Sequence, residues 1–180
     1  MKVFIDPGHG GEDNGAAYGY AEEDDLNLII SLLMRPHLVE HGFKVMLARE
    51  SDKFLSLAMR CMLAGNWDAD LFVSIHCDAF HNETTSGMSV HIWQDTIVSE
   101  PLGRAIVSAL ANRFPKHRER GLQRSDFYVL RKTHCPAALV ECEFLSNLEM
   151  RHWLREPENQ FALAEAIAQG IRNYKNLLIG

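Results

Sequence analysis

Three short apolar runs, each leading to a residue that can bind a metal ion or a proton, constrain this chain more than any other feature. They are Lys2–Ile5, Leu71–His76 and Ala137–Val140, and each is typical of a buried strand. Segments with helical spacing separate and follow them: the stretch after the acidic cluster Glu22–Asp25, then Phe54–Trp67, Pro101–Phe114, Asn147–Arg155 and Glu158–Leu177. Because strands that alternate with helices build parallel sheets, we expect one α/β domain over residues 1–180, with a mostly parallel twisted sheet covered by helices on both faces.

Finer boundaries follow from turn and helix signals. The acidic cluster suits the N-terminus of the first helix, where negative charge interacts favourably with the helix dipole. Pro36 should kink or interrupt that helix, and Gly42 should end it. Further strands are predicted at Phe43–Ala48, Ser89–Trp93 and Tyr128–Leu130, and the segment Lys116–Arg124 is locally basic.

Composition excludes several classes of protein. The chain has 180 residues, of which 47% are hydrophobic, and this is enough for one domain with a sizeable core. A formal net charge of −6 argues against nucleic acid as the partner. No apolar run is long enough for a transmembrane helix, so no stable membrane association is expected. The four cysteines lack C-x-x-C spacing, which indicates reduced thiols that pack as small apolar residues. A monomer is the default expectation.

Polar residues at the strand ends meet at one edge of the sheet if the strands are parallel neighbours. His9 follows the first run, His76 ends the second, and Glu141 follows the third. A glutamate that opens the first helix, Glu22 or Glu23, lies close in sequence to the same edge. Two imidazoles and one carboxylate, with a fourth position open to water, have the composition of a catalytic zinc site. A further glutamate beside them would be the general base.

Simpler explanations stand beside this one. His9 could merely cap a turn, because glycines flank it on both sides. Residues two apart on a strand share a face, so strand geometry alone does not separate Glu141 from Glu143. The remaining histidines are most simply surface or packing residues; they are His37, His41, His81, His91, His117, His134 and His152.

Four motifs occur in order along the chain: D-P-G-H-G-G at 6–11, E-D-D-L-N-L at 23–28, L-F-V-S-I-H-C-D-A at 71–79 and A-L-V-E-C-E-F-L-S-N at 138–147. Together they resemble the zinc-dependent N-acetylmuramoyl-L-alanine amidases of the Amidase_3 type, over essentially the whole chain. The resemblance implies hydrolysis of the amide bond between N-acetylmuramic acid and L-alanine in peptidoglycan, which degrades the bacterial cell wall. It also implies one Zn²⁺ ion with a bound water, held by His9, Glu23 and His76, and assigns the catalytic glutamate to Glu141.

This chain departs from the motif pattern at Glu143, where relatives often carry a small residue.

The resemblance extends to the biological setting. The first predicted strand begins at Lys2 and leaves no room for a leader, and no wall-binding module is evident. The chain is therefore similar to a phage or prophage endolysin, which is made in the host cytoplasm without a signal peptide and reaches the wall after a holin opens the membrane. A host lytic enzyme and a catalytic fragment are the alternatives.

Substrate recognition and two rival functions complete the expectations. Murein stem peptides carry carboxylates, so Arg124 or Arg131 in and near the basic segment is a candidate for binding one of them. A solvated basic loop explains the same residues equally well. The rival functions are another zinc peptidase that cleaves within the stem peptide, and a non-catalytic murein-binding domain.

Overall fold

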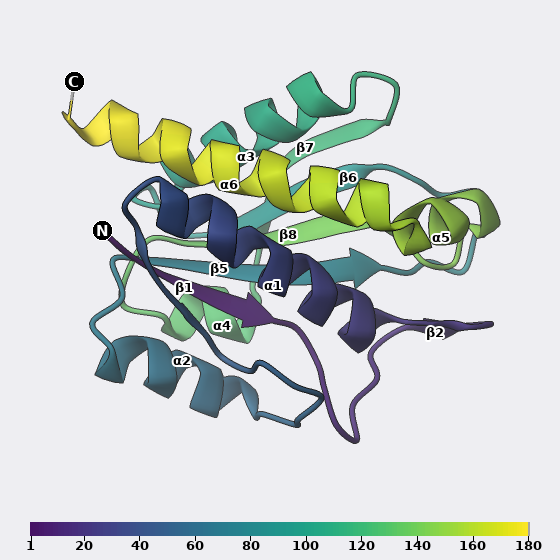
Figure 1. The fold of residues 1–180 in the computed structure, drawn as a ribbon, viewed down its shortest axis with the longest axis horizontal. Helices are drawn as coiled ribbons and strands as arrows, with labels where there is room; N and C mark the ends of the chain where they lie inside the picture. Colours follow the sequence, from purple (N-terminus) through teal and green to yellow (C-terminus); the bar gives the residue numbers. More distant parts are fainter. Residues whose placement is uncertain (180) are drawn as a thin grey trace.

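Six strands form the central sheet of this protein, for which a computed structural model describes residues 1–179 (Figure 1). In spatial order they are β4 (Lys44–Leu47), β1 (Lys2–Pro7), β5 (Leu71–Asp78), β8 (Ala137–Phe144), β6 (Met88–Trp93) and β7 (Glu119–Ser125). The first four are parallel, β6 runs antiparallel to β8, and β7 runs parallel to β6. A small two-stranded sheet, β2 (Ala17–Tyr18) with β3 (Ala21–Glu22), precedes the first helix.

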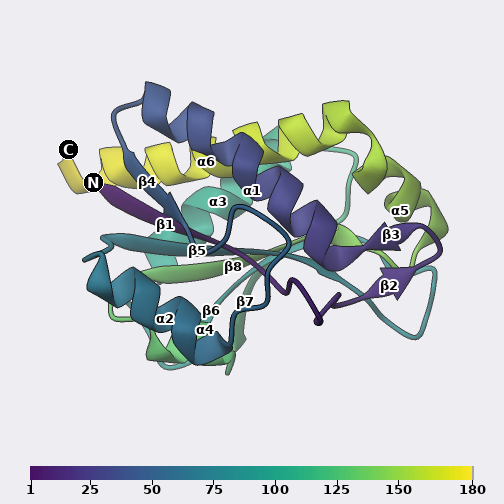
Figure 2. The ribbon, with the colours of Figure 1, turned by 60° about the horizontal axis from the view of Figure 1, so that its bottom comes forward.

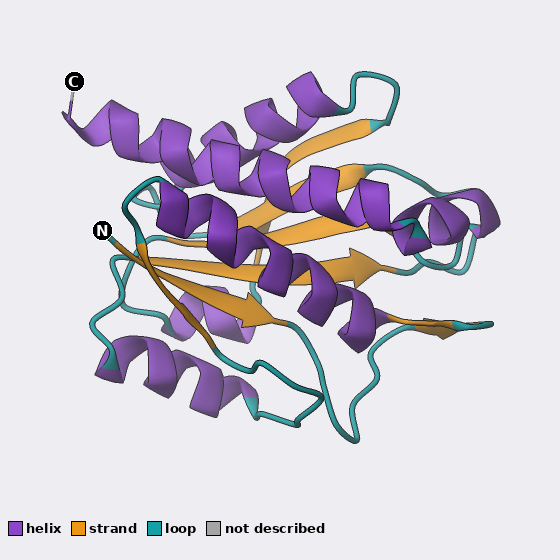
Figure 3. Cartoon of the chain, in the orientation of Figure 1, coloured by secondary structure: helices purple, strands orange, loops and turns teal. Residues whose placement is uncertain are grey.

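Helices cover the sheet on both faces (Figures 2 and 3). One face carries α1 (Glu23–Glu40), α3 (Glu100–Arg113) and α6 (Pro157–Ile179), with the shorter α5 (Leu148–Arg155) leading into α6. The other face carries α2 (Leu57–Asn66) and α4 (Tyr128–Lys132). The predicted fold class, one α/β domain with a mostly parallel sheet between two helical layers, is confirmed.

Alternation along the central strands divides the core in two. On β5, Val73 and Ile75 pack into the larger cluster beneath α1, α3 and α6, whereas Phe72 packs into the smaller cluster with α2 and α4. His76 is four residues beyond Phe72 and lies on the same side as that residue, the side that only two short helices cover. This partly open side of the sheet has room for a site.

Three local predictions need correction. Tyr128–Leu130 is not a strand but the start of α4, where the Arg131 N–H donates to the Phe127 carbonyl at 3.0 Å and Val129 packs against α2. Three apolar residues are too few for periodicity to separate a strand from a helix. Most of the segment taken as a basic loop is the strand β7, whose charges suit a sheet edge.

The third correction concerns Pro36. Helix α1 continues through Pro36 to Glu40 without interruption, because the proline lies in the final turns and removes one backbone donor there. Gly42 then follows the helix with a φ of +76°, as the prediction that it ends the helix requires.

The cysteines and the hydropathy of the helices agree with what the sequence predicts. All four cysteines are free thiols, and three of them are buried. Among the described residues, no helix combines the length and the apolar character needed to cross a bilayer.

Candidate metal centre

His9, Glu23 and His76 come together at the carboxyl ends of β1 and β5. One candidate ligand atom from each of the three lies within 4.8 Å of the others. Glu23 Oε1 is central, since it lies 2.9 Å from His76 Nδ1 and 3.3 Å from His9 Nε2. The two imidazole rings stand nearly perpendicular, with 5.0 Å between their centroids. Among the described residues this is the only cluster of histidine, cysteine or acidic side chains with ligand spacing.

Two glycines are required for this cluster to form. A Cβ atom on Gly8 would lie 2.2 Å from His76 Cε1, inside the imidazole ring's contact distance. A Cβ on Gly15 would lie 2.5 Å from Glu23 Oε2 and 2.6 Å from His9 Cδ2, and Gly15 also has a φ of +65°. The backbone therefore approaches the three side chains as closely as only glycine permits.

The loop that carries His9 is held by Asp13. His9 itself has a φ of +59°, which is uncommon for a residue with a side chain. Asp13 Oδ2 lies 2.9 Å from His9 Nδ1, and Asp13 Oδ1 accepts from the Gly15 N–H at 3.2 Å. Gly10 and Asp13 exchange two backbone hydrogen bonds. With Nδ1 engaged by Asp13, His9 directs Nε2 towards Glu23.

Two buried arginines fix the same loop from α2 and from the end of β4. Arg60 donates to the His9 carbonyl at 2.7 Å and forms a buried ion pair with Asp6 at 2.7 Å. Arg49 donates to the Gly8 carbonyl at 2.9 Å and to the Asp24 carbonyl at 2.7 Å, which ties the loop to α1. The sequence did not reveal either arginine, because most of their partners are backbone carbonyls and the one side-chain partner, Asp6, is 54 residues away from Arg60.

The electrostatics of the cluster favour a positive charge between the imidazoles. Burial opposes ionisation of both His9 and Glu23, but their hydrogen bond and mutual attraction raise the pKa of His9 to about 9. Burial by itself would raise the pKa of Glu23. Because both imidazoles donate to the Glu23 carboxylate, its pKa nevertheless lies well below the usual range. A carboxylate that lies between two imidazoles is thus kept ionised.

Glu141 lies directly beside His76, because the two residues are register partners on β8 and β5. Burial, followed by the charges of Asp78 and Glu23, raises the pKa of Glu141 well above its usual range. Its Oε2 atom is buried and has no hydrogen-bond partner among the described residues. Glu141, His9 and His76 line one cleft of about 560 Å³. A carboxyl group with this environment retains its proton more readily than an exposed one.

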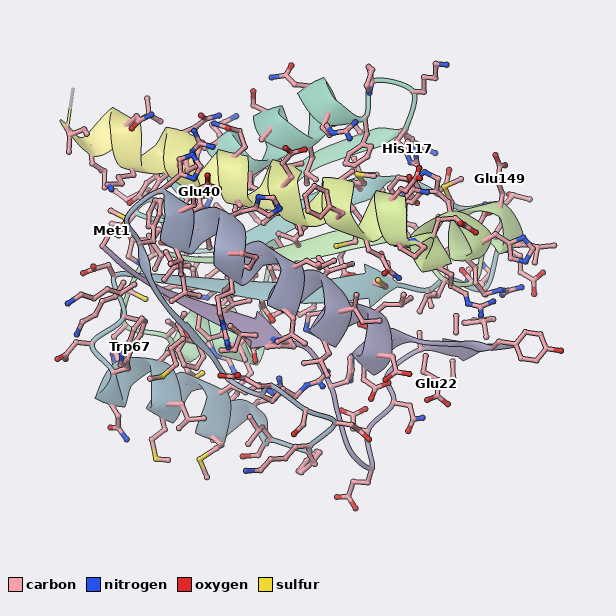
Figure 4. The ribbon with its side chains drawn as sticks, in the orientation of Figure 1. Met1, Glu22, Glu40, Trp67, His117 and Glu149 are labelled. Carbon is pink, nitrogen blue, oxygen red and sulfur yellow. The ribbon has the colours of Figure 1, made fainter. Side chains whose placement is uncertain are left out.

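Glu143 does not share the side of Glu141, so that expectation was wrong. The register shifts between His76 and Asp78, so two residues of β8 face one residue of β5 and the alternation is broken. Glu143 is fully buried, accepts from the Gly87 N–H at 2.7 Å and lies 3.0 Å from His117 Nδ1. Figure 4 shows His117 next to α3, away from the strand ends that carry the cluster.

The other rival pair is separated by burial. Glu22 is exposed at the N-terminus of α1, where Figure 4 labels it, whereas Glu23 is 5% exposed and points at the two imidazoles. Adjacent residues at a strand–helix junction project in different directions, so only one of the two reaches the cluster.

The two arginines proposed for substrate binding do not line the cleft. Arg124 donates to the carbonyls of Gln94 and Thr96 and pairs with Glu100 at 2.6 Å, so it joins β7 to α3 instead. Arg131 pairs with Asp126 and lies over the ring of Tyr128, a residue of the cleft rim. Arg124 is therefore engaged with β6, α3 and the loop between them and does not line the cleft. Arg131 lies beside Tyr128, at the edge of the cleft.

Known proteins resemble this chain over nearly its whole length. The family description N-acetylmuramoyl-L-alanine amidase (Amidase_3) matches residues 3–173. An uncharacterised Bacillus subtilis protein, YqiI, is 37% identical over 96% of this chain and 84% of its own length. The sporulation-specific N-acetylmuramoyl-L-alanine amidase of Bacillus subtilis is 32% identical over 98% of this chain and 69% of its own length.

The fold comparison agrees with the sequence comparison. The structure of the N-acetylmuramoyl-L-alanine amidase AmiC2 of Nostoc punctiforme superposes with a TM-score of 0.93 at 34% identity, and the match covers 98% of this chain and 97% of that one. The family resemblance predicted from the four motifs is confirmed: this chain belongs to the N-acetylmuramoyl-L-alanine amidase family of the Amidase_3 type.

Proposed function

We propose that this protein hydrolyses the amide bond between N-acetylmuramic acid and L-alanine in peptidoglycan, as a zinc enzyme with Glu141 as its general acid and base. The convergence of His9, Glu23 and His76 beside Glu141 carries the proposal. Family membership supports the substrate and the bond, because the related proteins are named for this activity.

The residues fit a zinc ion by their chemistry. Two imidazoles and one carboxylate form a donor set found in catalytic zinc sites with three protein ligands. The ionised Glu23 between His9 and His76 supplies the negative charge that a cation needs. Asp13 behind His9 is the kind of carboxylate partner that orients a metal-binding imidazole.

The chemistry divides between the ion and Glu141. When bound, zinc lowers the pKa of water and polarises a carbonyl oxygen. Glu141 lines the same cleft as His9 and His76, where it would face a water that attacks the scissile carbonyl. It accepts the proton of that water and then delivers it to the amide nitrogen of the departing L-alanine. Because burial raises the pKa of this carboxyl group, Glu141 can hold the proton between the two steps.

Purified murein sacculi test the reaction. Mass spectrometry should find intact stem peptides with a free L-alanine amino group, together with glycan strands. Stem peptides cut internally would instead indicate a peptidase, and retention of the protein on intact sacculi without any release would indicate a binding domain.

A pair of glutamate variants tests the assignment of roles. Glu141→Gln should lower kcat by about 10²–10⁴-fold, the usual contribution of general acid–base catalysis, and keep one zinc per chain. The matched control is Glu22→Gln, the same change at an exposed position, which should retain both zinc and activity. Loss of zinc from Glu141→Gln would place Glu141 among the ligands and contradict its assigned role.

The phage setting remains a prediction. The relatives at 30% identity or more include a Bacillus subtilis amidase named for sporulation, whereas the match to the catalytic domain of an endolysin, CD27L, is at 20% identity and shows the fold alone. Expression inside a bacterial cell should leave the cell intact until a holin or another agent permeabilises the inner membrane. Lysis without permeabilisation would contradict holin-dependent release.

A further inference from the structure

We propose that Phe54 and Phe127 bind an N-acetylhexosamine ring of the glycan strand, so that the enzyme recognises the sugar side of its substrate through two uncharged aromatic faces. This inference rests on the proposed function and adds the substrate group that the cleft walls contact. Both residues line the cleft that contains Glu141. They remain 45% and 39% exposed, and aromatic side chains that line a cleft are a common part of ligand sites.

The sheet order places the two rings on opposite sides of the reacting groups. Phe54 lies against Gly11 in the loop after β1, where a glycine Cβ would be 2.5 Å from the Phe54 nitrogen. Phe127 lies against His91 of β6, with 5.3 Å between the ring centroids. Strands β5 and β8, which carry His76 and Glu141, lie between β1 and β6. A group bound at the cluster therefore has one aromatic ring on each side.

Phe127 is held in place before any substrate arrives. His91 lies 2.8 Å from the Ser125 hydroxyl through Nδ1 and 3.1 Å from the Ser89 hydroxyl through Nε2. Ser89 in turn is the register partner of Glu141 across β6 and β8. His91 thus fixes the aromatic wall relative to the catalytic strand, and a wall that is already ordered loses little entropy when it binds a ligand.

The charges of the cleft favour the sugar over the stem peptide as the group that Phe54 and Phe127 contact. Stem peptides carry carboxylates, but the cations among the described residues of the cleft already have partners. Arg60 pairs with Asp6 and also donates to three backbone carbonyls, and His9 lies between Asp13 and Glu23. His76 likewise pairs with Glu23. Apart from the proposed zinc ion, the cleft therefore offers no free cation to a peptide carboxylate. A pyranose ring is uncharged, and its C–H groups suit the negative face of an aromatic ring.

Product binding tests this assignment without turnover. The zinc-loaded protein is titrated, by calorimetry or by NMR, with a peptide-free N-acetylglucosamine–N-acetylmuramic acid disaccharide and separately with the free stem peptide. Phe54→Leu and Phe127→Leu keep an apolar side chain but remove the aromatic face. Each should weaken disaccharide binding by about 3- to 10-fold, the range for one aromatic contact, and leave stem-peptide binding unchanged.

Two further variants serve as controls, one for the loss of an aromatic ring outside the cleft and one for a conservative change inside it. Phe161→Leu removes an aromatic ring of similar exposure on α6, outside the cleft, and should change neither affinity. Phe127→Tyr keeps an aromatic face and should bind the disaccharide as the unmodified protein does. Thermal melting of each variant shows whether it is folded.

The outcomes separate this inference from the proposed function. Weaker stem-peptide binding with unchanged disaccharide binding would overturn the inference, as would no disaccharide binding at millimolar concentration. The mass-spectrometric assay on sacculi decides the proposed function independently. If stem peptides are released but the leucine variants bind the disaccharide normally, only the inference about the aromatic faces fails.

Discussion

Asp13 should control the zinc affinity of His9 although it is not a proposed ligand. Its Oδ2 atom lies 2.9 Å from His9 Nδ1, which leaves Nε2 for Glu23 and the ion. Asp13→Asn keeps an oxygen that can accept from Nδ1 but removes the negative charge. Asp13→Ala removes the acceptor of His9 and also that of the Gly15 N–H. The two changes therefore separate charge from geometry.

The expected magnitudes follow from this contact. Replacing a residue that hydrogen-bonds a metal-binding histidine typically weakens metal binding by about 10- to 100-fold. The Asp13 side chain is 47% exposed, so solvent screens its charge and Asp13→Asn should be at the low end. We expect a loss of about 10-fold, or ~1.4 kcal/mol, for Asp13→Asn. The loss should approach about 100-fold for Asp13→Ala, because the loop is released as well.

Competition with a chromophoric chelator measures the zinc dissociation constant of each variant directly. Asp25→Asn is the matched control, since it makes the same change of charge at an exposed position in the first turn of α1. An Asp13→Ala protein that binds zinc as tightly as the unmodified protein would refute the reasoning. It would mean that His9 is oriented by its backbone alone.

Three other predictions concern the groups around the cleft. Arg60→Met should destabilise the fold by about 3–5 kcal/mol in urea unfolding, because it leaves the Asp6 carboxylate buried without its ion pair. Adding Asp6→Asn should recover part of that loss, and no recovery would show that the backbone contacts dominate. Gly8→Ala should abolish stoichiometric zinc binding, measured by atomic absorption, since its Cβ would lie 2.2 Å from His76 Cε1; a fully loaded variant would contradict this. Burial lowers the pKa of His91 to about 4 in the folded protein. The unfolded chain therefore takes up the proton first, and the free energy of unfolding should fall by about 1–2 kcal/mol between pH 6.5 and 4, after allowance for solvent screening. His91→Gln should lose that component when both proteins are unfolded in urea across this pH range, whereas parallel pH profiles would contradict it.

Local patterns in the sequence were sufficient to predict a sheet covered by helices on both faces. The apolar runs that became β1, β5 and β8 carry enough β-branched and aromatic residues to be recognised alone. Weakly apolar segments were not recognisable in this way. The edge strand β7 has one neighbour and exposed charges, and α4 has only five residues, so neither has a periodic pattern long enough to interpret.

The sequence by itself determined which polar side chains lie towards the carboxyl ends of the buried strands, because apolar runs and turn residues are local signals. The exact strand ends were not predicted, since β5 continues past His76 to Asp78 and β8 continues past Glu141 to Phe144. His9, His76 and Glu141 follow from those local signals, and the four motifs specify the family. Only the tertiary structure decided that Glu143 points away from Glu141, because a register shift against β5 breaks the alternation. It also decided that Arg60 holds the loop of His9, since the Asp6 carboxylate and the carbonyls of Pro7 and His9, to which it donates, are more than 50 residues away in the sequence. Pairing register and backbone contacts depend on segments far apart in the chain, and no local pattern records them.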